Sequence, residues 1–300
     1  MAAACDGPVR ELVRGAPART LHGLVLGYGG FRDDLPDSTV LREPPSCAVP
    51  VIVDLGCGWR VSTPADGYRP RHLVGFTAGL HDAYALVEPA GPTAGVQIDL
   101  SPLAARRLFR VPMRELTNRV AAIDDLLGPL AGVLRERLGE ARSWPERFAM
   151  LDELLMPSLS GGAAVSPGVE WAWRRLQSTG GAVSVTWLAA ELGWSRKRLV
   201  AHFRDEVGLP PKAAARVMRF GAMTSRLRSG RPQSWAELAL DLGYFDQAHL
   251  AREVRLLAGV TPGELLADLR RGSARDSPRS GRLRAVPAKH PSNTAGCPDR

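Results

Sequence analysis

The stretch LALDLGYFDQAHLAREVRLLAGVTPGEL, residues 238–265, decides the fold of the C-terminal part of this chain. It repeats an earlier segment, because LALDLGYF at 238–245 matches LAAELGWS at 188–195, with Leu238 lying 50 residues after Leu188. After one inserted residue the match resumes at an offset of 51, as in Leu199 and Leu250. Each copy has the pattern of a short helix, a turn that contains glycine and a second helix, which is the helix-turn-helix plan.

The second helix of each copy has one apolar face and one polar face. Apolar residues four positions apart, such as Leu199 and Phe203, are expected to face the core. The residues between them point outward, where Arg and Lys can pair with guanine and Gln with adenine in the major groove. These base-reading candidates are Arg196, Lys197, Arg198 and His202 in the first copy and Gln247, His249 and Arg252 in the second. The candidates for phosphate contacts, which would fix the register on DNA, are Arg204, Lys212, Arg216, Arg219 and Arg255. Any one of these side chains could equally lie on a solvated helix face, but the repetition favours DNA.

Composition limits the class of protein. The chain has 300 residues, 45% hydrophobic and 23% charged, which is typical of a globular protein long enough for two domains. Its net charge of +8 favours polyanionic partners. No apolar run reaches the roughly 18–20 residues of a membrane span, and the N-terminus lacks the pattern of a secretory signal. We therefore expect a cytoplasmic protein without a membrane partner, whose four scattered cysteines are free thiols.

The character of the sequence changes twice along the chain. Short β-type runs separated by Gly and Pro turns fill residues 20–100, which predicts antiparallel strands in a sandwich or barrel. The runs are LHGLVLGY (21–28), VPVIVDLG (49–56), WRVST (59–63), RHLVGFTAG (71–79), YALVEP (84–89) and AGVQIDL (94–100). Helical patterns follow Ser101 and Pro102, an expected N-cap and first helical residue, and they include 120–138 and 144–156. The predicted domains are a β-rich domain at 1–157 with a helical connector at 101–156, a linker at 158–168, a helical domain at 169–271 and a disordered basic tail at 272–300.

Residues 169–270 resemble the double helix-turn-helix DNA-binding domain of AraC/XylS-type transcription regulators. LGYFDQAHLAREVRLLAGVTPGEL at 242–265 resembles the family signature almost position by position, and SRKRLVAHFRDEVGLPPKAA at 195–214 resembles the first half. The resemblance implies seven helices, a linker helix over 214–227, two recognition helices in successive major grooves and control of transcription initiation. By analogy of architecture it also implies that 1–157 is a sensor or dimerisation domain. It assigns base reading to Lys197, Val200, Ala201, Gln247, Ala248, Ala251 and Arg252. The family usually has Arg at the position of Ala201, so we expect weaker base preference in the half-site read by 195–206 than in the half-site read by 246–256.

A second motif points to a different class of function. VIVDLGCGWR at 51–60 resembles the nucleotide loop of Rossmann-like S-adenosylmethionine methyltransferases, and HLVGFTAG at 72–79 resembles their second strand. Arg60 replaces the last glycine and Thr77 replaces the ribose-binding acid. VSTPADGYRP at 61–70 cannot form the crossover helix that parallel strands require. We favour a tight hairpin turn over residues 56–58 and a structural Asp54.

The expected fold class is therefore α+β, with an antiparallel β-rich domain and a helical connector before an all-α double helix-turn-helix domain. The expected function is a sequence-specific DNA-binding transcription regulator and not an enzyme, with a methyltransferase fused to a DNA-binding domain as the alternative. His22, His72 and His81 lack the spacing of a cupin metal site, and we expect no catalytic residue, metal or cofactor. Double-stranded DNA is the expected partner. RNA polymerase, an unidentified small-molecule effector and a second copy of the chain are further possible partners. As an alternative, the N-terminal half could serve only oligomerisation.

Overall fold

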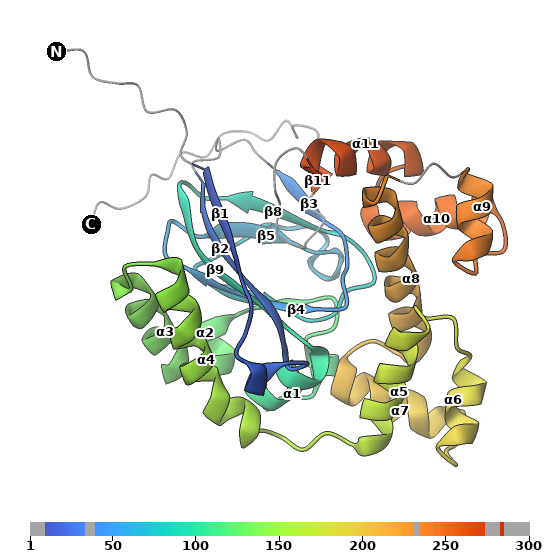
Figure 1. Ribbon diagram of the computed structural model, residues 1–300, viewed down its shortest axis with the longest axis horizontal. Helices are drawn as coiled ribbons and strands as arrows, with labels where there is room; N and C mark the ends of the chain where they lie inside the picture. The colour runs from blue at the N-terminus through green and yellow to red at the C-terminus, as the bar shows by residue number, and fades with distance from the viewer. Residues whose placement is uncertain (1–9, 34–39, 231–233, 274–282, 285–300) are drawn as a thin grey trace.

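The fold comes from a computed structural model, which describes residues 10–33, 40–230, 234–273 and 283–284. Two facing β-sheets form the N-terminal part, and helices form the C-terminal part (Figure 1). All strand pairs in the described sheets are antiparallel. This arrangement confirms the predicted α+β class and the sandwich-like N-terminal domain.

Each sheet has its own strand order. The first follows β1 (Arg10–Gly15), β2 (Val25–Asp33), β9 (Thr93–Leu100), β4 (Val49–Asp54), β7 (Phe76–Ala78) and β10 (Val120–Ala122). The second follows β11 (Leu283–Arg284), β3 (Leu41–Glu43), β8 (Ala85–Pro89), β5 (Trp59–Ser62) and β6 (Arg71–Leu73). Short 3₁₀ turns occupy Arg19–Leu21, Pro64–Asp66 and Met113–Glu115.

Three local predictions are corrected by the sheets. The turn over residues 56–58 is not a hairpin, because β4 and β5 lie in different sheets and do not pair. The run 71–79 is two strands, β6 and β7, which separate at Gly75, where φ is +80°. The helical pattern over 120–138 begins as strand β10, because residues 120–122 complete the edge of the first sheet beside β7.

Four helices cover one face of the first sheet (Figure 1). They are α1 (Pro102–Phe109), α2 (Ile123–Leu127), α3 (Pro129–Glu140) and α4 (Trp144–Ser160). Ser101 is the N-cap of α1 as predicted, and its hydroxyl oxygen accepts from the Ala104 N–H at 3.3 Å. Alternate residues of β9, among them Val96, Ile98 and Leu100, are buried against this helical layer, so the remaining residues of β9 face the second sheet.

Seven helices follow in the described C-terminal part, the number implied by the family resemblance. They are α5 (Pro167–Ser178), α6 (Val185–Glu191), α7 (Arg196–Val207), α8 (Pro211–Arg228), α9 (Trp235–Asp241), α10 (Gln247–Ala258) and α11 (Pro262–Ser273). No described helix is long and apolar enough to cross a membrane. The predicted disorder of 272–300 falls mostly outside the described residues, but strand β11 contradicts it at 283–284 by pairing with β3.

The buried apolar side chains form separate clusters. One cluster joins the connector helices to the first helix-turn-helix unit and includes Met113, Phe203 and Leu209. Another, formed by residues between 220 and 269, is the core of the second unit alone. The first helix-turn-helix unit is therefore packed into the N-terminal domain, whereas the second has a core of its own.

Candidate nucleic-acid interface

The first helix-turn-helix unit consists of α6, a four-residue turn and α7. The turn needs Gly193, whose φ of +62° is unfavourable for other residues. Ser195 is the N-cap of α7, and its hydroxyl oxygen accepts from the Arg198 N–H at 3.1 Å. Leu199 and Phe203 are fully buried, as their spacing predicted.

The second unit repeats this construction with α9 and α10. Gly243 has the same left-handed conformation as Gly193, with φ of +74°. Ser234 and Glu237 form a capping box at the start of α9. The N-cap of α10 is Asp246, whose carboxylate accepts from the His249 N–H at 2.6 Å. The two units therefore have the same internal framework.

Most base-reading candidates of the first unit are exposed on α7. Arg196, Lys197, Arg198, Ala201 and His202 are exposed, and Val200 is half-buried. Two of these side chains are ordered by the Trp194 ring. The Arg198 guanidinium lies 4.7 Å from its centroid, and the His202 ring lies 5.2 Å from it.

The candidates of the second unit lie on α10. Gln247, Ala248 and Arg252 are exposed, whereas His249 and Ala251 are half-buried. The His249 Nδ1 accepts from the Phe245 N–H at 3.3 Å, and the ring lies edge-on to Tyr244 with centroids 5.5 Å apart. Because Nδ1 accepts, the neutral ring carries its proton on Nε2, which leaves that nitrogen as a donor.

The five phosphate candidates fall into two groups. Arg204, Lys212 and Arg255 are exposed. Arg216 and Arg219 are half-buried and have partners inside the domain. Arg216 Nε donates to Glu253 at 2.8 Å, which joins α8 to α10, and the Arg219 guanidinium lies 5.7 Å from the Tyr244 centroid. These two side chains hold the second unit against α8.

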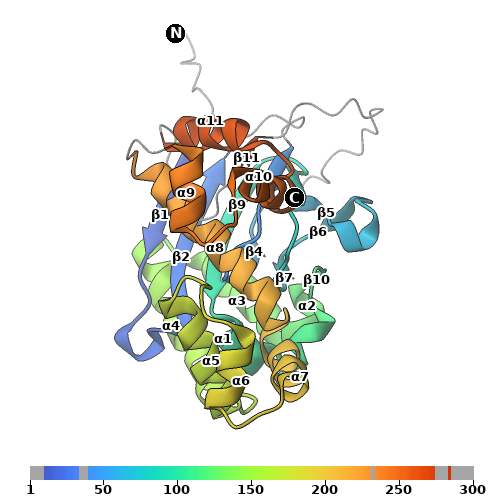
Figure 2. The same ribbon diagram turned by 90° about the vertical axis from the view of Figure 1, so that its right-hand side faces the viewer.

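Helix α8 connects the units and places them at opposite ends. Figure 2 shows α7 at one end of α8 and α10 near the other.

The N-terminal domain contacts both helix-turn-helix units. Asp205 of α7 forms an ion pair with Arg114, and the Thr117 hydroxyl donates to the Gly208 carbonyl at 2.9 Å. At the second unit, a Cβ on Gly259 would lie 2.5 Å from the Tyr84 ring.

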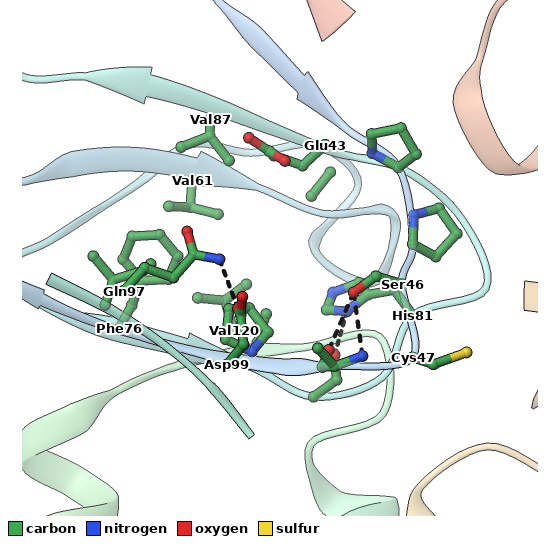
Figure 3. Close-up of a pocket in the computed structure, with 18 of the residues that line it drawn as sticks. Glu43, Ser46, Cys47, Val61, Phe76, His81, Val87, Gln97, Asp99 and Val120 are labelled. Atoms are coloured by element: carbon green, nitrogen blue, oxygen red, sulfur yellow. Dashed lines mark hydrogen bonds between the residues drawn. The ribbon is translucent and has the colours of Figure 1, made fainter. Parts of the chain in front are cut away.

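A cavity of about 320 Å³ lies between the two sheets of the N-terminal domain (Figure 3). Its walls are mainly apolar, from residues such as Ile52, Val61, Phe76, Val87 and Val120. Gln97 and Asp99 interrupt this lining on β9, and the Gln97 amide donates to the Asp99 carboxylate at 2.7 Å. Sequence reasoning missed this pair, although AGVQIDL alternates apolar residues with Gln and Asp.

His81 and Cys47 lie at one end of the cavity. His81 is buried, and its Nδ1 donates to the Gly79 carbonyl at 2.6 Å. Burial lowers the pKa of His81, which favours the neutral ring. Burial also raises the pKa of Cys47 to about 12, so this thiol stays protonated. Cys47 and Cys57 form no disulfide, as predicted, and Cys5 and Cys297 lie outside the described residues.

Asp54 is part of the turn between the sheets. Its carboxylate accepts from the Gly56 N–H at 3.1 Å, the Gly58 N–H at 2.9 Å and the Trp59 indole N–H at 3.0 Å. The side chain is buried, so all these contacts are internal. The antiparallel sheets and this bonded carboxylate give no support to a methyltransferase nucleotide site. Within the described residues, no group of three or more His, Cys, Asp or Glu side chains could hold a metal ion.

Comparisons with known proteins found one family model and several solved structures that are similar to parts of this chain. Residues 188–268 match the family model of the helix-turn-helix domain. The C-terminal domain of AraT, a response regulator from Geobacillus stearothermophilus, is 22% identical, and the match covers 36% of this chain and 88% of that one with a TM-score of 0.32. ToxT from Vibrio cholerae O395 is 10% identical over 76% of this chain and 92% of ToxT, with a TM-score of 0.44. No curated protein matches the chain.

Proposed function

We propose that this chain, a DNA-binding transcription regulator with a double helix-turn-helix domain of the AraC/XylS type, reads two successive major-groove segments with α7 and α10. The observation that supports this most directly is the duplication itself. Each unit presents exposed polar and basic side chains on its second helix, and one long helix joins the two units. Helix-turn-helix proteins place the N-terminal residues of such helices against base edges.

The roles of individual residues follow from their exposure. We assign base reading in the second unit to Gln247 and Arg252, and in the first unit mainly to Lys197, with Arg196, Arg198 and His202 beside it. We assign phosphate contacts to Arg204, Lys212 and Arg255, because Arg216 and Arg219 already have partners within the domain. Because its proposed partner is DNA, we place the protein in the cytoplasm.

The test uses the purified full-length chain and a pool of random DNA duplexes. We expect selection to enrich one sequence, and the affinity for that operator to fall steeply with salt as phosphate-bound counterions are released. A basic protein of equal charge serves as the control for non-specific binding. Equal affinity of the chain for all duplexes would contradict the proposal.

We also propose that a small molecule in the cavity between the sheets regulates DNA binding. The volume of about 320 Å³ is at the lower end of the range for ligand pockets, and a mainly apolar lining with few polar groups is typical of them. The lining includes the carboxylates of Asp99 and Glu43 and, among the described residues, no Arg or Lys. A carboxylate accepts several hydrogen bonds at once, so the favoured ligand is apolar with a hydroxyl or ammonium donor.

Calorimetry with 2-phenylethylamine and with 3-phenylpropanoate as probes tests this ligand class. We expect the amine to bind more tightly than the carboxylate, and Ala78→Leu, which fills part of the cavity, to abolish the difference. The affinity for the selected operator is then measured with and without the amine. Binding that leaves operator affinity unchanged would favour an N-terminal domain that serves only oligomerisation, and sedimentation of the free chain would show whether it forms a dimer.

A further inference from the structure

Phe245 is the most exposed large hydrophobic side chain in the described part of the chain. Its exposed fraction is 86%, compared with 67% for Leu240 and 49% for Leu256. It lies between Tyr244, which is buried in the core of the second unit, and Asp246, the N-cap of α10. Single exposed apolar residues are common on protein surfaces, so exposure alone assigns no role.

Comparison of the two units in the structure shows that Phe245 is the inserted residue, which corrects its match to Ser195 in the sequence repeat. The turns begin alike at Leu192 and Leu242, but the first has four residues before α7 and the second has five before α10. The N-caps Ser195 and Asp246 correspond, since each side chain accepts from the backbone N–H three residues later. Phe245 therefore has no counterpart in the first unit, and the shared framework does not need it.

The backbone around Phe245 is fixed from both sides. Its N–H donates to His249 Nδ1 at 3.3 Å, and His249 packs edge-on against Tyr244. Because His249 belongs to α10, the position of Phe245 relative to that helix is set before any partner binds. The phenyl side chain is thus exposed to solvent from a fixed backbone position at the N-terminal end of the proposed recognition helix.

We propose that Phe245 reads a thymine by packing its ring against the C5-methyl group in the major groove. This inference rests on the proposed function, because it requires α10 to lie in that groove. Recognition helices contact bases through their N-terminal residues, and the thymine methyl is the apolar group that a base pair presents there. The ring exchanges water for the methyl group on binding, which gives the second unit a base preference that hydrogen bonds from Gln247 and Arg252 do not supply.

The test replaces each thymine of the selected operator in turn by deoxyuridine, which removes only the methyl group. We expect one position where the unaltered chain loses affinity about 4-fold, the amount that corresponds to one buried methyl group. At that position Phe245→Ala binds thymine and uracil equally. Phe245→Leu keeps an apolar side chain and retains part of the preference, and equal thermal midpoints show that the variants are folded.

The outcomes separate this inference from the proposed function. Failure to select any operator would contradict the DNA-binding proposal itself. In a second outcome, Arg252→Ala lowers the affinity for the operator while Phe245→Ala keeps the full preference for thymine over uracil. That result would overturn only the role of Phe245. A change in sedimentation caused by Phe245→Ala, with the thymine preference intact, would also overturn it and would point to a contact between copies of the chain.

Discussion

The carboxylate of Asp54 accepts three hydrogen bonds within five residues of sequence. Replacement by Ala would leave two backbone N–H groups and the Trp59 indole without their acceptor. We expect Asp54→Ala to lower the free energy of unfolding by about 2–4 kcal/mol, measured by urea denaturation, because unsatisfied buried donors are costly. Equilibrium dialysis with S-adenosylmethionine should show no micromolar binding. Saturable binding of S-adenosylmethionine to the parent chain, lost in a folded Asp54→Ala variant, would support the methyltransferase alternative.

Arg252 offers a test of base reading by one side chain. It is exposed on α10, about one and a half turns after the first helical residue, Gln247. We expect Arg252→Ala to lose about 1–3 kcal/mol of binding free energy at the operator and to relax the preference at one base pair. Arg204→Ala is the matched control, since loss of a phosphate contact weakens all sequences alike and reduces the salt dependence. Uniform weakening by both variants would make Arg252 a phosphate contact.

Glu206 links pH to stability. It is buried, its carboxylate accepts from the Ser166 N–H at 2.7 Å, and burial raises its pKa above the usual value. A carboxyl group whose pKa is raised in the folded state stabilises the fold at low pH, where it is protonated. This contribution to the free energy of unfolding is lost as the pH rises through the raised pKa. Glu206→Gln keeps an acceptor without the charge, so we expect it to be more stable than the parent at pH 7.

Urea denaturation between pH 4 and pH 8 measures this difference. The advantage of Glu206→Gln should fade as the pH falls and Glu206 takes up its proton. Glu191→Gln, at an exposed position on α6, is the control and should show no such trend. An advantage that stays constant over the whole pH range would mean that the buried charge is not its cause.

At the scale of elements, α7 and α10 differ in what they offer to bases. Helix α10 carries Gln247 and Arg252, whereas α7 has Arg196 and Ala201 at the corresponding positions, with Lys197 as the main polar reader. Bidentate pairs discriminate bases better than apolar contacts do. We therefore predict an asymmetric operator, with larger penalties for base changes in the half read by 246–256. Equal penalties in both halves, measured by systematic substitution, would contradict this asymmetry.

The elements also show how far sequence reasoning reached. The repeat predicted the helix-turn-helix units well, because helical spacing and turn glycines are local signals. The strands were harder, since the sheet that a strand joins depends on distant partners. Strand β1, at 10–15, and strand β3, at 41–43, were missed, and β4 and β5 were joined into one hairpin although they belong to different sheets. The cavity could not be foreseen, because it forms only where the sheets face each other.

For the whole molecule, the attachment of the first unit to the N-terminal domain is the feature to test. The Thr117 hydroxyl donates to the Gly208 carbonyl just after α7. We expect Thr117→Val to lower the free energy of unfolding by about 1 kcal/mol, because a partly buried hydrogen bond is lost without a change in shape. Thr224→Val is the control, since that hydroxyl bonds only within α8. Equal losses in both variants would mean that the contact between domains adds no stability.

The separate apolar clusters also set the order in which the chain can fold during synthesis. Domains generally fold as units, N-terminal first, as the chain is made. The first unit packs on residues such as Met113, which are synthesised before it, so its core is complete once α8 has emerged from the ribosome. The second unit draws its core only from residues between 220 and 269, and such local contacts favour rapid folding. A nascent chain that has emerged from the ribosome up to about residue 230 would therefore already carry a folded first unit, before the second unit has its own residues.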